Sequence, residues 1–166
     1  MANVSEYGVR RFGRVNWLGV WTLIRRENMR YLAIWQQTIF APLITAGLFL
    51  LVFSIAIGPG RSDVMGFSYV VFLAPGLLMM TVIQNSFANT SSSMLSAKVM
   101  GSIVDTLMPP LSPVEMVIGF VAGGIGRGLM IGAVLVLAMW LTLEISVAHP
   151  IWTFVFVILG AMFMGA

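Results

Sequence analysis

The chain has 166 residues, of which 59% are hydrophobic and only 9% are charged, and it contains no cysteine. Soluble domains carry about 25% charged residues, so this composition argues against a soluble enzyme or a nucleic-acid-binding module and indicates an integral membrane protein. Without cysteine there are no disulfides and no cysteine-ligated metal sites. The net charge of +3 does not point to nucleic acid, because six of the nine basic residues lie within the first 30 positions, a distribution typical of membrane proteins.

Residues 1–30 are the predicted cytoplasmic N-terminus, with an amphipathic helix at about residues 16–30. Apolar side chains would share one face of this helix and basic ones would lie toward the other: Trp17, Val20, Trp21, Ile24 and Tyr31 against Thr22, Arg25, Arg26 and Arg30. Tryptophans beside arginines are typical of a helix at the lipid headgroups. The helix either anchors the chain or also contributes to a docking surface for a cytoplasmic partner.

Four apolar segments predict an all-α, polytopic bundle of transmembrane helices, with spans at about residues 35–58, 66–90, 114–143 and 151–166. The sequence Gly58-Pro59-Gly60-Arg61-Ser62-Asp63 is expected to end the first span. As one helix, the charge-free stretch Val64–Ala97 would measure ~51 Å, which is too long for one crossing. Its second half is polar, so the second span is expected to end along a protein-lined surface, and Pro75-Gly76 is expected to kink it.

The last apolar segment, Ile151–Ala166, would form only ~24 Å of helix, short of the ~30 Å that a crossing requires. It stops within an apolar run and has no flanking charge or aromatic anchor. These features predict a chain that is truncated after the start of its fourth span.

Lysine and arginine counts predict the orientation of the bundle. Six basic residues precede the first span and Lys98 follows the second, whereas the opposite loops contain only Arg61. The positive-inside rule therefore places the N-terminus and the Lys98 connection in the cytoplasm.

The cytoplasmic connection, at about residues 94–113, is expected to contain a short helix from about Ile103 to Met108. Ser102 and Asp105 have the spacing of a capping box, and Pro109-Pro110 would stop the helix. Ser112-Pro113-Val114-Glu115 then has the pattern of an N-cap, an N1 proline and an acidic N3 residue, so the third span is expected to begin there. The connection is either a plain loop or an apolar tip, made by Val104, Leu107 and Met108, that a partner could hold.

Polar residues within the spans are candidates for a substrate path. Asn85 and Asn89 have i, i+4 spacing, and Ser92 follows on roughly the same face. Such groups act as hydrogen-bonding glue between helices or line a path for a polar substrate, and the sequence does not separate the two.

Arg127 lies ~21 Å from the start of its helix, which predicts a position well inside the bilayer. A charge at that depth costs roughly 2.5–3.5 kcal/mol, so it is expected to face protein or water, in a packing role or in the substrate path. Small-residue spacings around it predict close helix packing, at Gly119, Gly123, Gly124, Gly128 and Gly132.

Several chemistries have no candidate residues. The chain has no P-loop motif, and its only histidine is His149, so we expect no catalytic site, no metal site and no cofactor in this chain.

Six segments together resemble the membrane-spanning permease subunits of type-2 ABC transporters, especially the bacterial polysaccharide- and Nod-factor-export-like branch. The segments are Phe72-Leu73-Ala74-Pro75-Gly76-Leu77-Leu78-Met79-Met80, Asn85-Ser86-Phe87-Ala88-Asn89, Ser96-Ala97-Lys98, Ser102 to Met108, Gly119 to Gly132 with Arg127-Gly128, and His149-Pro150.

The resemblance implies a six-span permease, of which four spans are present, in a bacterial inner membrane. It also implies a coupling helix that would sit in a cleft of a separate ATPase subunit and would consist of Ser102, Ile103, Val104, Asp105, Thr106, Leu107 and Met108. ATP and Mg²⁺ would bind to that ATPase, and the substrate would pass between this chain and a second permease copy or a paralogue. Membrane lipid is the other expected partner. The alternative is a membrane scaffold or regulatory subunit that does not transport.

Overall fold

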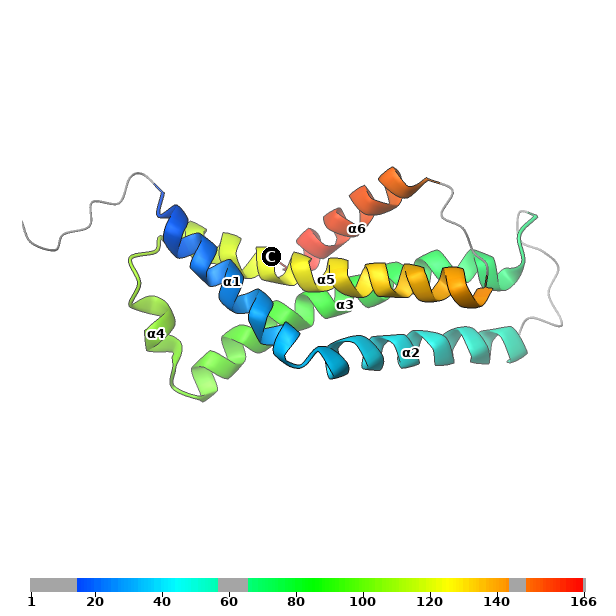
Figure 1. The fold of residues 1–166 in the computed structure, drawn as a ribbon, viewed down its shortest axis with the longest axis horizontal. Helices are drawn as coiled ribbons and strands as arrows, with labels where there is room; N and C mark the ends of the chain where they lie inside the picture. The colour runs from blue at the N-terminus through cyan, green and yellow to red at the C-terminus, as the bar shows by residue number, and fades with distance from the viewer. Residues whose placement is uncertain (1–14, 57–65, 144–148, 166) are drawn as a thin grey trace, which may run out of the picture.

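The computed structural model describes residues 15–56, 66–143 and 149–165, which form six helices and no strand (Figure 1). The helices are α1 (Trp17–Ala33), α2 (Trp35–Ala56), α3 (Tyr69–Val99), α4 (Ile103–Leu107), α5 (Pro113–Leu143) and α6 (Pro150–Gly165). The predicted all-α class is confirmed. The expected turn at 58–63 and most of the turn before Pro150 lie outside the described residues.

Three helices, α2, α3 and α5, are long and apolar enough to cross a membrane, and α6 is apolar but shorter. α3 continues as one helix to Val99, well past the predicted end of the second span at about residue 90. Its polar second half is helical throughout, and Ser86, Asn89 and Ser93 on it are buried against other helices. The expectation that this half of α3 follows a protein-lined surface is therefore confirmed.

The apolar core lies where α3, α5 and α6 pack together, with a contribution from α2. Its buried side chains are Ala46, Ala74, Leu78, Val82, Ile131, Leu135, Met139, Val157 and Ala161. α3 and α5 run antiparallel side by side (Figure 1), since Gly123 approaches Asn89 whereas Gly132 approaches Val82.

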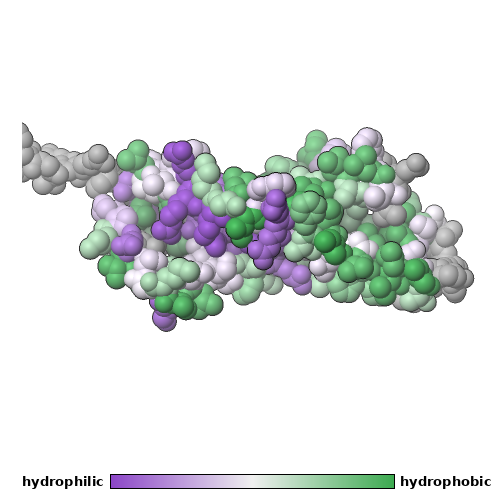
Figure 2. Space-filling model, turned by 60° about the horizontal axis from the view of Figure 1, so that its bottom comes forward, coloured by the Kyte–Doolittle hydropathy of each residue, from purple (hydrophilic) through white to green (hydrophobic). Residues whose placement is uncertain are grey.

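α1 packs along the first half of α5, and α2 begins near the level at which α1 ends (Figure 1). In order along the two helices, Leu23 lies against Gly119 and Glu27 lies against Gly123. The hydrophilic residues gather on the half of the molecule that contains α1, whereas hydrophobic residues cover the half that contains α2 (Figure 2). The molecule therefore divides into a polar part around α1 and an apolar part around α2.

The face of α1 that packs against the bundle does not include the two tryptophans. Trp17 and Trp21 are 74% and 64% exposed, whereas Val20, Leu23, Glu27 and Tyr31 are buried. The position of Trp17 and Trp21 at the lipid headgroups stays a prediction. The stripe of α1 that packs against the bundle contains the charged Glu27, which a pattern of apolar residues does not mark.

Hydrogen bonds of Glu115 join the beginnings of α1 and α5. One oxygen of Glu115 accepts from the Ser112 backbone N–H at 2.7 Å, and the Ser112 hydroxyl accepts from the Glu115 N–H at 3.3 Å, which confirms the predicted cap of the third span. The other oxygen accepts from the backbone N–H of Asn16 at 2.7 Å. The side chain of Asn16 caps α1 through the Gly19 N–H at 3.0 Å.

The capping box predicted at Ser102 and Asp105 is wrong. Ser102 occupies the N-cap position of α4, but its side chain makes no capping hydrogen bond. The Asp105 N–H instead donates to the backbone oxygen of Ser102 at 3.1 Å. In a capping box the Asp105 N–H would donate to the Ser102 hydroxyl, but here it donates to the Ser102 backbone oxygen instead.

Replacing Glu115 with alanine is expected to lower the free energy of unfolding by about 1–2 kcal/mol, because two backbone N–H groups lose their acceptor. Unfolding in mixed detergent micelles measures this loss. Glu115→Gln retains one acceptor oxygen and should lose less. Equal losses for the two variants would contradict the assignment of both oxygens to separate donors.

Candidate functional site

A buried carboxylate on α1, Glu27, lies against α5 and links α1 to α3. Glu27 is 1% exposed, and one of its oxygens accepts from the Ser93 hydroxyl at 2.8 Å. The same oxygen lies 3.3 Å from the guanidinium of Arg26, and the second lies 3.2 Å from that of Arg30. Both oxygens of Glu27 are therefore compensated by charge and hydrogen bonds, as a buried charge requires.

Arg30 extends this contact to α3. Its guanidinium donates to the backbone oxygen of Asn89 at 2.8 Å, to the Asn89 side-chain oxygen at 3.1 Å and to the Ser92 hydroxyl at 3.3 Å. Asn89 itself is completely buried. The structure thus brings α1 and the polar half of α3 together through one ionic and hydrogen-bonded cluster.

Arg127 lies at the end of this cluster, on α5. Its guanidinium donates to the side-chain oxygen of Asn85 at 3.4 Å, so two of the predicted polar residues meet, whereas Asn89 binds Arg30 instead. The bond goes to a side-chain amide, and no bond to a helix carbonyl is present among the described residues. Burial raises the pKa of the nearby Tyr31 phenol, and the positive charge of Arg127 acts in the opposite direction.

The depth predicted for Arg127 was counted from the start of α5. Because α1 runs along the first half of α5, the adjacent Gly126 lies beside Asn28 and Tyr31 of α1, at 2.9 Å and 3.0 Å from an ideal Cβ. Arg127 therefore lies near the level at which α1 ends and the charge-free α2 begins. The distance along α5 does not measure its depth in the bilayer.

The five glycines predicted to pack lie at close contacts of α5. A Cβ at Gly119 would collide with Leu23 and one at Gly128 with Ser86, and one at Gly123 would lie 2.6 Å from the Cβ of Glu27. At Gly124 the nearest atom is the Thr90 hydroxyl at 3.0 Å, and at Gly132 it is a methyl of Val82 at 3.1 Å. Glycine at these positions allows α1 and α3 to approach the backbone of α5.

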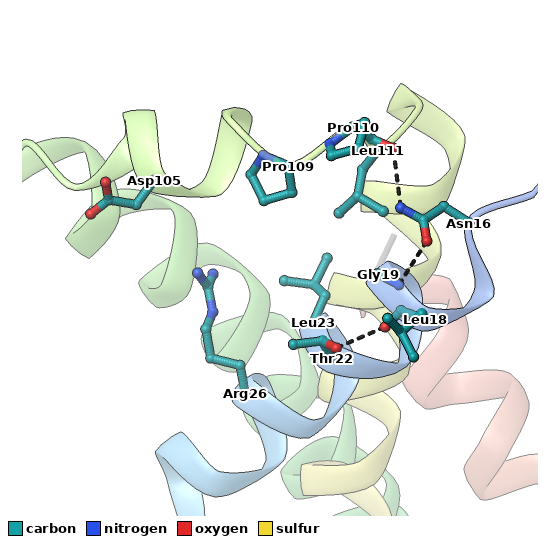
Figure 3. Close-up of a pocket in the computed structure, with 10 residues that line it drawn as sticks. All are labelled: Asn16, Leu18, Gly19, Thr22, Leu23, Arg26, Asp105, Pro109, Pro110 and Leu111. Carbon is teal, nitrogen blue, oxygen red and sulfur yellow. Dashed lines mark hydrogen bonds between the residues drawn. The ribbon is translucent and has the colours of Figure 1, made fainter. Parts of the chain in front are cut away.

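α4 connects α3 to α5 and exposes Val104 and Met108, which are 53% and 77% accessible. The side chains of Thr106 and Leu107 lie outside the described part of the chain. Beside α4 is a pocket of about 250 Å³ between α1 and the connection to α5 (Figure 3). Leu23 and Leu111 line it, and Arg26 and Asp105 stand at one end of it (Figure 3).

Among the described residues, no group of three or more histidine, aspartate or glutamate side chains could hold a metal ion. The site is instead a set of helix contacts and exposed surfaces.

Comparison with known families gives the chain its classification. The family model of the ABC-2 type transporter matches residues 19–166. The chain belongs to this family. The resemblance to type-2 ABC permeases, drawn from motifs such as Asn85-Ser86-Phe87-Ala88-Asn89, is thereby confirmed.

Two relatives of this ABC-2 chain are the inner membrane transport permeases YadH of Escherichia coli strain K12 and of Shigella flexneri. Each is 38% identical over 139 residues, which make up 84% of this chain and 54% of the relative. The chain therefore spans about half the length of the curated relatives that it matches. No solved structure gives a significant match.

Sequence reasoning missed the residue at the centre of the ABC-2 chain's polar cluster. Glu27 was not singled out, although it is the acidic residue on a helix with three arginines, and Arg30 follows it at i+3. That spacing is the signal that could have found the pair. No sequence pattern indicates that Ser93 would supply the third contact, from 66 positions away.

Proposed function

We propose that the chain is a multi-pass permease subunit of an ATP-driven exporter in a bacterial inner membrane. The observation that carries this proposal is the ABC-2 family match over residues 19–166, and the inner-membrane permease names of the relatives support the location. Because the sequence has no P-loop, ATP and Mg²⁺ would bind to a separate ATPase subunit. A second permease copy or a paralogue would complete the path for the substrate.

The surface proposed to meet the ATPase is α4. It lies at the polar end of the molecule, between the ends of α3 and α5, and exposes Val104 and Met108 (Figure 1). Exposed apolar side chains on so short a helix have no packing role within the described chain, and they suit insertion into a cleft of a partner. The neighbouring pocket would widen this docking surface toward α1.

ATP-driven closure of two ATPases would then move α4. The bonds of Glu115 fix the beginning of α5 to that of α1, and the Glu27 cluster fixes α1 to α3. Movement of α4 would therefore carry α1 and the adjoining halves of α3 and α5 together, as a rigid-body step toward alternating access.

Asn85, Asn89 and Arg127, which were all candidates for the substrate path or for helix packing, are now assigned different roles. Asn89 is completely buried and bonded to Arg30, which favours helix packing. Asn85 and Arg127 are only partly buried and remain candidates for the substrate path.

Co-purification with an ATPase tests this proposal. The detergent-solubilised protein from the complete reading frame should retain the ATPase encoded beside it. Combined Val104→Ala and Met108→Ala changes should reduce retention about tenfold, since truncation of apolar anchors weakens an interface. Met94→Ala is the matched control, because Met94 is also exposed but lies on α3. If wild type retains no ATPase under mild conditions, the exporter proposal fails and the scaffold or regulatory role takes its place.

A further inference from the structure

The described residues around the junction of α1 and α2 carry an excess of positive charge. Arg26, Arg30 and Arg127 gather there, and the acidic side chain among them is Glu27. Both oxygens of Glu27 are already engaged by Arg26, Arg30 and Ser93. Nothing acidic is left in the described cluster to compensate Arg127.

Arg127 is the least satisfied member of this cluster. Its one hydrogen bond is the 3.4 Å contact to the uncharged amide of Asn85, and its buried Nε has no partner among the described residues. Arg30 binds Asn89, one turn of α3 away from Asn85, so the two guanidiniums bind to neighbouring turns of the same helix. A guanidinium with unused donors beside a second guanidinium is the arrangement that binds a phosphate group.

The place of these two arginines also points to an anionic ligand. α2, which contains no charge over 22 residues, begins just after Arg30, so the cluster lies at the level where the charge-free helix starts. Trp35, at the start of α2, is half exposed, as is typical of tryptophan at the headgroup level. Basic residues directly beside a span attract anionic lipid headgroups.

We propose that Arg30 and Arg127 together bind a phosphate-class anion at the junction of α1, α2 and α5. Two sources carry that chemistry: the headgroup of an anionic phospholipid, and a free anion such as the acidic end of the exported molecule. For the second source, the inference rests on the proposed function. Bound anion would compensate the charges of the two arginines and hold α1 and α5 together at this level.

Thermal unfolding of the purified protein in a neutral detergent tests the site. The probes are short-chain phosphatidylglycerol, short-chain phosphatidylcholine and inorganic phosphate. Phosphatidylglycerol should raise the Tm of wild type, and phosphatidylcholine should not. In Arg127→Gln the affinity for phosphatidylglycerol should fall about fivefold, whereas Arg127→Lys should retain most of it. Arg25→Gln is the control, because Arg25 is exposed on the same helix, and it should change the affinity by less than about twofold.

The two sources give different results in the presence of inorganic phosphate. Phosphate that raises the Tm and competes with phosphatidylglycerol supports a site for free anions, whereas phosphate without effect supports a headgroup site. Equal stabilisation of wild type by phosphatidylcholine overturns the proposal, even if Arg127→Gln does not fold. Equal losses in Arg127→Gln and Arg25→Gln also overturn it, since they would indicate an unspecific basic surface. The exporter proposal is tested by co-purification of the ATPase with α4 variants, and the anion site is tested by the shift in Tm. Failure of one can therefore be distinguished from failure of the other.

Discussion

Replacing Glu27 with alanine is expected to lower the free energy of unfolding by about 3 kcal/mol, the largest effect of any substitution proposed for this protein. The change removes the acceptor of the Ser93 hydroxyl and the counter-charge of Arg26 and Arg30. A buried pair that loses one partner costs about 3–5 kcal/mol. The lower end applies because the side chains of Arg26 and Arg30 keep 47% and 36% of their surface exposed, so water can solvate them.

Unfolding in mixed detergent micelles measures this loss, with far-UV circular dichroism to report helix content. Glu27→Gln keeps an acceptor for Ser93 but removes the charge, and it should lie between wild type and Glu27→Ala. Arg25→Ala, on the exposed side of α1, is the control and should change stability by no more than about 0.5 kcal/mol. A loss for Glu27→Ala as small as that of the control would show that the cluster contributes nothing to holding α1 on α3.

The second large effect is expected for Gly123→Ala, at about 1–3 kcal/mol of destabilisation. A Cβ at this position would lie 2.6 Å from the Cβ of Glu27 and 3.3 Å from its Cγ. The Cβ of Glu27 is fixed to its backbone, so relief requires α1 itself to move away from α5. That movement would also strain the contact of Glu27 with Ser93, which links the two predictions.

Gly47→Ala supplies the matched control for this substitution. Gly47 also lies within a helix, α2, but a Cβ there would meet nothing within 4 Å. Since glycine inside a helix costs roughly 0.5–1 kcal/mol relative to alanine, Gly47→Ala should be neutral or stabilising. The same unfolding measurement should show a loss of stability for Gly123→Ala and no loss for Gly47→Ala. Destabilisation of equal size in both would contradict the close approach of α1 to α5 at Gly123.

The sequence alone was sufficient to predict that this is a helical membrane protein and to predict the order of its helices along the chain. A low charge content and long apolar runs require helices that satisfy their own backbone hydrogen bonds in lipid, so the helices α2, α3, α5 and α6 could be located from composition. The cap at Ser112 and Glu115 was also predictable, because its two bonds join residues three positions apart. Orientation and the coupling role of α4 remain predictions.

Only the tertiary structure decided how α1 sits on the bundle and which polar groups meet. A pattern of apolar residues cannot identify a buried face that contains Glu27, because the burial of that charge depends on Ser93, 66 positions away, as well as on Arg26 and Arg30 nearby. Asn89 binds Arg30 of α1, whereas Asn85 binds Arg127 of α5. These partners too are distant in sequence and meet only in the folded chain. Local sequence sets which helices form, whereas partners brought together by folding set which charges those helices can bury.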